Sequence, residues 1–130
     1  MKKLGLKVYR FSLSWARIVD LETGKLRDDG VRFYNELIDC LLENGIEPYI
    51  TIYHWDLPIE LQRAGGWLSP ELPKKFADYT KTVVKLFSDR VSHWFTLNEE
   101  LCFIPVVPWI FHAHRFSDLI AIVAVWFEFF

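Results

Sequence analysis

The amino-acid sequence predicts an α/β fold in which parallel strands alternate with helices. Runs with strand character at residues 7–14, 47–53 and 94–98 are separated by segments 31–44 and 72–87, whose apolar residues recur at helical spacing. Such alternation implies parallel pairing with right-handed crossovers. No glycine-rich phosphate loop follows any of these strands, which argues against a nucleotide-binding fold.

The first strand is predicted from alternation. Tyr9, Phe11 and Leu13 would share one face, which leaves Arg10 on the other face. An arginine in the middle of such a strand needs a carboxylate partner, so an ordinary salt bridge is the first interpretation of Arg10.

The first helix is predicted over residues 31–44, after a polar loop at residues 20–29. Its apolar positions include Phe33 and Leu42, and Gly45 would end it as a left-handed cap. Cys40 falls on the apolar side of this helix, where we expect a buried free thiol.

The second helix has a sequence signature at its start. Ser69 is expected to be the N-cap, with Pro70 at the first helical position and an acidic residue, Glu71, after it. Pro73 would still lie in the first turn, where no amide hydrogen bond is lost.

Polar side chains follow the second and third strands at the points where these strands end. His54, Trp55 and Asp56 follow the second strand, and Asn98 and Glu99 follow the third. In parallel barrels the carboxyl ends of the strands carry the active site, so these residues are candidates for binding or catalysis. A structural corner after the second strand and a solvated acidic turn after the third remain open as alternatives.

Composition narrows the function classes. A length of 130 residues allows one domain or part of a larger one, and 52% hydrophobic residues predict a packed core. The net charge of -2 gives no electrostatic case for nucleic acid or an anionic membrane. The two cysteines, Cys40 and Cys102, have neither disulfide-framework nor metal spacing. No signal-peptide pattern follows Met1, so the expected compartment is the cytoplasm.

The character of the chain changes after Ile104. Residues 105–130 are apolar and aromatic, with no clean period and no capping residues. The continuous apolar run at 119–127 is shorter than the roughly 20 residues that a membrane span needs. We therefore expect a domain at residues 1–104 and a divergent tail at 105–130, for which a frameshift is one explanation.

Six stretches of the sequence occur in an informative order and spacing. They are Tyr9-Arg10-Phe11-Ser12-Leu13-Ser14-Trp15, Gly30-Val31-Arg32-Phe33-Tyr34-Asn35, Gly45-Ile46-Glu47-Pro48, Tyr53-His54-Trp55-Asp56-Leu57-Pro58, Gly65-Gly66-Trp67-Leu68 and Thr96-Leu97-Asn98-Glu99. Together they resemble the family 1 glycoside hydrolases, the β-glucosidase family. The resemblance is nearly continuous from Leu4 to about Ile104.

The resemblance implies a fold, a reaction and roles for five residues. The fold would be a partial (β/α)8 TIM barrel, comprising roughly strands 2 to 4 with their helices. Glu99 resembles the general acid/base, and Asn98 resembles the residue that binds the sugar 2-hydroxyl. His54 and Trp55 look like contacts to the glycone, and Arg10 resembles the arginine that positions the nucleophile, which replaces the salt-bridge interpretation. The partner would be a β-glycoside or oligosaccharide, with no cofactor, metal, nucleic acid or membrane, and the oligomeric state is not indicated.

The sequence departs from the family pattern in three respects. Glu100 stands where the family has proline, residues 105–130 replace the usual continuation, and the stretch containing the carboxylate nucleophile is absent. Strict alternation would also put Asn98 and Glu99 on opposite faces, so a family-like site needs a twist or bulge at the strand end. A sugar-binding remnant without turnover, and an unstable truncation product, are the alternatives to a glycosidase.

Overall fold

In the computed structural model, which describes residues 1–99, three strands form one parallel sheet in the order β1-β2-β3. They are β1 (Val8–Ser12), β2 (Glu47–Tyr53) and β3 (His93–Leu97). The α/β alternation and the parallel pairing predicted from the sequence are confirmed. The bounds of β2 are as predicted, and those of β1 and β3 differ slightly from the predicted ones.

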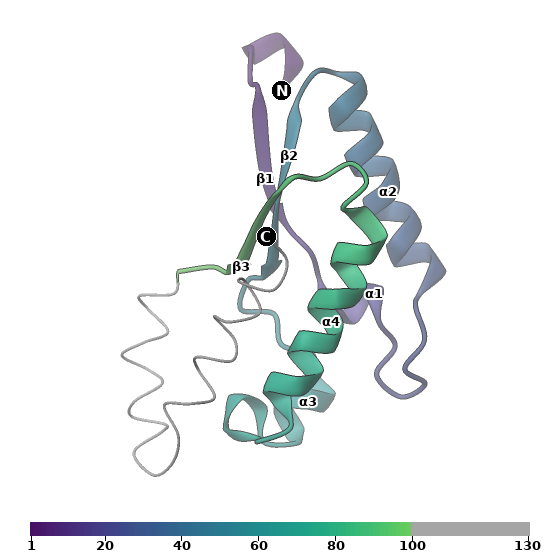
Figure 1. The fold of residues 1–130 in the computed structure, drawn as a ribbon, viewed down its shortest axis with the longest axis vertical. Helices are drawn as coiled ribbons and strands as arrows, with labels where there is room; N and C mark the ends of the chain where they lie inside the picture. The colour runs from purple at the N-terminus through teal and green to yellow at the C-terminus, as the bar shows by residue number, and fades with distance from the viewer. Residues whose placement is uncertain (100–130) are drawn as a thin grey trace.

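Two long helices connect these strands and lie on the same side of the sheet (Figure 1). They are α2 (Asp28–Glu43) and α4 (Leu72–Phe87). The shorter helices are η1 (Lys2–Leu4), α1 (Trp15–Ile18), α3 (Ile59–Arg63) and η2 (Gly66–Leu68). Neither α1 nor α3 was predicted, because one turn of helix is too short to show a 3.6-residue period.

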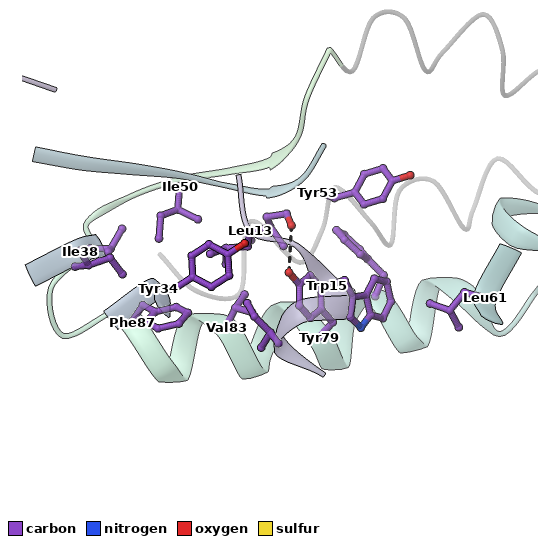
Figure 2. Close-up of a cluster of buried hydrophobic side chains, with 14 of the residues drawn as sticks. Leu13, Trp15, Tyr34, Ile38, Ile50, Tyr53, Leu61, Tyr79, Val83 and Phe87 are labelled. Carbon is purple, nitrogen blue, oxygen red and sulfur yellow. Dashed lines mark hydrogen bonds between the residues drawn. The ribbon is translucent and has the colours of Figure 1, made fainter. Parts of the chain in front are cut away.

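The core fills the space between the sheet and the helices (Figure 2). Its most deeply buried side chains come from the helix-facing positions of β2, from both long helices and from the segment after β1, and include Leu13, Ile18, Ile38, Ile50, Phe76, Val83 and Phe87. Burying one such side chain fully contributes roughly 1.5–3 kcal/mol. The contact between the helices and the helix-facing side of the sheet therefore stabilises the fold.

The buried face of α2 is narrower than the sequence suggested. Phe33 and Leu42 are 46% and 41% exposed, so their expected burial is wrong. Cys40 is also exposed, which contradicts the predicted buried thiol. Only one stripe, including Tyr34 and Ile38, meets the sheet, and Cys40 lies two positions, about 200° of helical turn, from Ile38.

The start of α4 also differs from the prediction. The helix begins at Leu72 with Glu71 at the N-cap position, so Ser69 is not the N-cap and Pro70 is not the first helical residue. The carbonyl oxygen of Ser69 instead accepts a hydrogen bond of 3.1 Å from the Leu72 amide in the preceding turn. Pro73 does lie in the first turn, as expected.

Several expectations concern residues outside the described part of the chain. Glu100, Cys102, the boundary at residue 104 and the tail at 105–130 all lie beyond residue 99 and stay predictions. Within residues 1–99, no helix is long and apolar enough to cross a membrane.

The contact between α1 and α2 depends on a glycine. Gly30 is buried in the first turn of α2, and a Cβ atom there would overlap the backbone carbonyl of Arg17 in α1. A larger residue therefore forces the two helices apart.

We expect Gly30→Ala to lower the stability of the protein by about 1–3 kcal/mol through overpacking. The measurement is the midpoint of urea unfolding followed by tryptophan fluorescence, with Arg32→Ala on the exposed side of the same helix as the control. An ordinary glycine-to-alanine change in a helix stabilises by about 1 kcal/mol, so a raised midpoint would contradict the close contact.

Two sheet edges and one sheet face are exposed in the described part of the chain. Within residues 1–99, β1 and β3 each pair with β2 only, and the face opposite the helices carries Val8 at 41% and Phe95 at 39% exposure. Unpaired edges beside an apolar surface promote association between chains.

We therefore expect the isolated 130-residue chain to form oligomers or aggregates and to unfold with low cooperativity. Sedimentation velocity and a thermal scan test this expectation. A monomer that melts in one sharp transition would contradict it.

Candidate active site

The face of the sheet that points away from the helices carries polar and aromatic side chains. Arg10 pairs in register with Tyr49, and Ser12 pairs with Thr51. On the other side of β2, Thr51 pairs with Phe95. These positions alternate with the core positions, so the face opposite the core is available for a functional site.

Arg10 reaches from β1 across the central strand to β3. Its Nε donates a hydrogen bond of 2.7 Å to Oγ1 of Thr51, and its Nη2 donates one of 2.9 Å to Oδ1 of Asn98. Its guanidinium carbon lies 4.4 Å from the ring centroid of Phe95, a distance typical of a cation–π contact. Within residues 1–99, Arg10 makes no salt bridge with a carboxylate, so the first interpretation of this residue is wrong for this part of the chain.

Asn98 lies at the carboxyl end of β3 and is only 7% exposed. Its backbone amide donates to the carbonyl oxygen of Tyr53 at 3.0 Å, which extends the ladder between β2 and β3 by one residue. Because its Oδ1 accepts from Arg10, the side-chain amide nitrogen is turned away from the guanidinium, and this nitrogen makes no hydrogen bond within residues 1–99.

Glu99 ends the strand in an unusual backbone conformation. Its φ angle is 54°, in the left-handed region that residues other than glycine seldom adopt. The alternation of a strand therefore stops at Asn98, and Glu99 is exposed beside it. The twist or bulge that a family-like site requires is consistent with this backbone turn, and left-handed residues of this kind cluster at functional sites.

His54 and Trp55 follow β2 at the same edge of the sheet, because parallel strands bring their carboxyl ends together. Both residues are exposed, and Trp55 has a φ angle of 69°. Oδ1 of Asp56 accepts a hydrogen bond of 3.4 Å from the amide of His54, so Asp56 holds the turn. The sharp turn presents the two side chains at the surface.

Two tyrosines lie beneath this edge. The Trp67 indole donates a hydrogen bond of 3.2 Å to the Tyr53 hydroxyl. Burial raises the pKa of Tyr53, with a smaller contribution from the charge of Asp56, although the hydrogen bond from Trp67 opposes the rise. Burial also holds the pKa of Tyr79 well above its usual value. Both phenols therefore stay protonated at neutral pH and are not general bases.

The predicted site residues fall into two groups. Arg10 and Asn98 are in direct contact, and His54, Trp55 and Glu99 follow the carboxyl ends of β2 and β3. Within residues 1–99, no three histidine, cysteine or acidic side chains are placed to hold a metal ion.

Sequence reasoning missed Thr51 as a member of the site. It lies two residues before the end of β2 and is fully buried against Arg10. Threonine is common in strands, so its presence alone does not indicate a functional contact. Only the register of β2 against β1 identifies the contact of Thr51 with Arg10. Thr51 is in register with Ser12, two residues beyond Arg10, so the polar residue on the central strand that the long arginine side chain can reach was the available signal.

The chain matches known proteins over most of its described length. The model of glycosyl hydrolase family 1 matches residues 1–115. Among curated relatives, β-glucosidase A of Thermotoga maritima is 49% identical over 110 residues, which is 85% of this chain and 23% of that protein. Coniferin β-glucosidase of Pinus contorta is 46% identical over 107 residues, which is 82% of this chain and 21% of that protein. The chain thus spans less than a quarter of the length of these relatives.

Solved structures agree in fold. The β-glucosidase from Thermotoga maritima in complex with deoxynojirimycin aligns with a TM-score of 0.73 at 53% sequence identity, over 75% of this chain and 22% of that chain. The three parallel strands with their helices are accordingly part of a (β/α)8 barrel. The sheet, the polar strand ends and the match over residues 1–115 together show that the chain belongs to glycosyl hydrolase family 1.

Proposed function

We propose that this chain contributes the acid/base half of the active site of a retaining β-glucosidase. The observation that carries the proposal is the hydrogen bond between Arg10 and Asn98, formed at the strand ends next to Glu99. The names of the relatives support β-glucosides as the substrate class. The structure of a relative with bound deoxynojirimycin supports a sugar-sized ligand.

Each residue has a separate role in this proposal. Glu99 is the general acid that protonates the leaving oxygen and later the base that activates water. Asn98 donates from its side-chain nitrogen to the sugar 2-hydroxyl, because its oxygen already accepts from Arg10. His54 and Trp55 contact the glycone, the indole offering a stacking plane.

Retaining hydrolysis also needs a nucleophile. The two carboxyl groups of such a site lie roughly 5 Å apart, one as acid/base and one as nucleophile. The Nη1 nitrogen of Arg10 makes no hydrogen bond within residues 1–99, so its N–H groups can bind a carboxylate. The proposed nucleophile comes from the part of the barrel that residues 1–99 do not contain, and the cytoplasmic location expected from the sequence remains a prediction.

We expect the isolated 130-residue chain to show no turnover of an aryl β-glucoside, because no carboxylate contacts Arg10 within residues 1–99. The measurement is release of the aryl group at high protein concentration, compared with the Glu99→Gln variant. Turnover that disappears in Glu99→Gln would show that another segment or another chain supplies the nucleophile.

A hybrid enzyme tests the roles directly. Residues 1–99 replace the equivalent segment of β-glucosidase A of Thermotoga maritima, which supplies the rest of the barrel. We expect the hybrid to hydrolyse an aryl β-glucoside and Glu99→Gln to lower its kcat by about 10²–10⁴-fold, the usual contribution of general acid–base catalysis.

The control for this prediction is Glu60→Gln, a change to an exposed carboxylate in the short helix α3 that should leave kcat unaltered. A folded hybrid without activity, or one that Glu99→Gln does not impair, would remove the support for the proposed function.

A further inference from the structure

Thr51 occupies a special place on the central strand. It pairs with Ser12 on one side and with Phe95 on the other, so it lies beneath the side chain that crosses from β1 to β3. It is only 1% exposed, yet its polar atom is aimed at Arg10. A buried hydroxyl needs a partner, and Thr51 meets this need through the Arg10 Nε hydrogen.

Three contacts fix the orientation of the guanidinium group. Thr51 holds Nε at 2.7 Å, Asn98 holds Nη2 at 2.9 Å, and the ring of Phe95 lies against the planar group at 4.4 Å. The two hydrogen bonds use different nitrogens, so together they set the rotation of the group within its plane. Arg10 is otherwise exposed, and without the bond to Thr51 it is free to turn towards solvent.

We infer that Thr51 is a positioning residue that acts through Arg10 in the proposed reaction. The inference rests on the proposed function. Oγ1 of Thr51 directs Nη1 of Arg10 towards the position of the carboxylate nucleophile. It also keeps Nη2 on Oδ1 of Asn98, which leaves the Asn98 amide nitrogen facing the sugar.

The position of Arg10 affects both the pKa of the nucleophile and the rate of the reaction. A guanidinium group beside a carboxylate favours the ionised form of that carboxylate and lowers its pKa. Loss of the Thr51 bond therefore raises the pKa of the nucleophile, and the acidic limb of the pH profile moves to higher pH. Misplacement of a group by about 1 Å can cost up to about 10²-fold in rate.

Two substitutions separate positioning from simple packing. Thr51→Val keeps the shape and the β-branched side chain but removes the acceptor. Thr51→Ser keeps the hydroxyl and removes a methyl group. A packing role predicts that serine is the more harmful change, whereas a positioning role predicts that valine is. Thr80→Val is the matched control, because Thr80 is a buried threonine on α4 whose hydroxyl bonds the Phe76 carbonyl of the same helix.

The experiment measures kcat, KM and the pH dependence of kcat/KM for these variants of the hybrid enzyme. We expect Thr51→Val to lower kcat by about 10-fold or more with KM changed less than about threefold, the pattern of an interaction lost in the transition state. The acidic limb should rise by about one pH unit. We expect Thr51→Ser to remain within about threefold of the parent and Thr80→Val to match it in kcat and pH profile.

Three outcomes overturn the inference in distinguishable ways. An inactive but folded parent hybrid removes the proposed function, and the role of Thr51 with it. An active parent with an equally active Thr51→Val variant removes the role of Thr51 alone. An active parent in which Thr51→Ser is impaired more than Thr51→Val assigns Thr51 to packing, and not to the position of Arg10.

Discussion

The hydrogen bonds of one arginine connect all three strands on the open face of the sheet. Arg10 comes from β1, bonds Thr51 on β2 and bonds Asn98 at the end of β3. Arg10 is in register with Tyr49, two residues before Thr51, and Asn98 follows the end of β3, so the long arginine side chain extends towards the carboxyl ends of the strands to make these contacts. Within residues 1–99, Arg10 is the donor to the buried side-chain oxygen atoms of Thr51 and Asn98, and leaving such an atom unpaired costs about 1–3 kcal/mol. These hydrogen bonds therefore satisfy buried polar atoms of the sheet, and they also form part of the candidate site.

The two faces of the sheet have different tasks. The helix-facing positions of β2 bury Ile50 and Ile52 in the hydrophobic core, and this burial stabilises the sheet. The opposite face carries charged and aromatic groups that contribute less to stability. A rigid scaffold is what a catalytic group requires, and here Arg10 and Thr51 lie on strands while Asn98 and Glu99 follow directly after one.

The amino ends of the strands also differ from their carboxyl ends. At the amino end, His93 stacks on Tyr49 with ring centroids 4.2 Å apart, and its Nδ1 lies 3.1 Å from a carboxylate oxygen of Glu47. Both members of that pair are about half exposed, so it contributes at most about 1 kcal/mol. At the carboxyl end the backbone turns sharply at Trp55 and Glu99, both with positive φ angles. Among residues 1–99, the non-glycine residues with positive φ angles thus both lie at the end that carries the candidate site.

The sequence alone determined the order of the three strands and the two long helices, the bounds of β2, and the polar residues at the strand ends. These features depend on local periodicity and on turn residues such as Gly45, whose φ angle is 68°. The exposure of Cys40 depended on which stripe of α2 meets the sheet, and the start of α4 at Leu72 depended on the preceding turn. Arg10 contacts Thr51, which lies 41 positions away in the sequence, and Asn98, which lies 88 positions away. Only the tertiary structure decided these contacts, because the register between strands is set by packing across the whole sheet and leaves no periodic signal in any one strand.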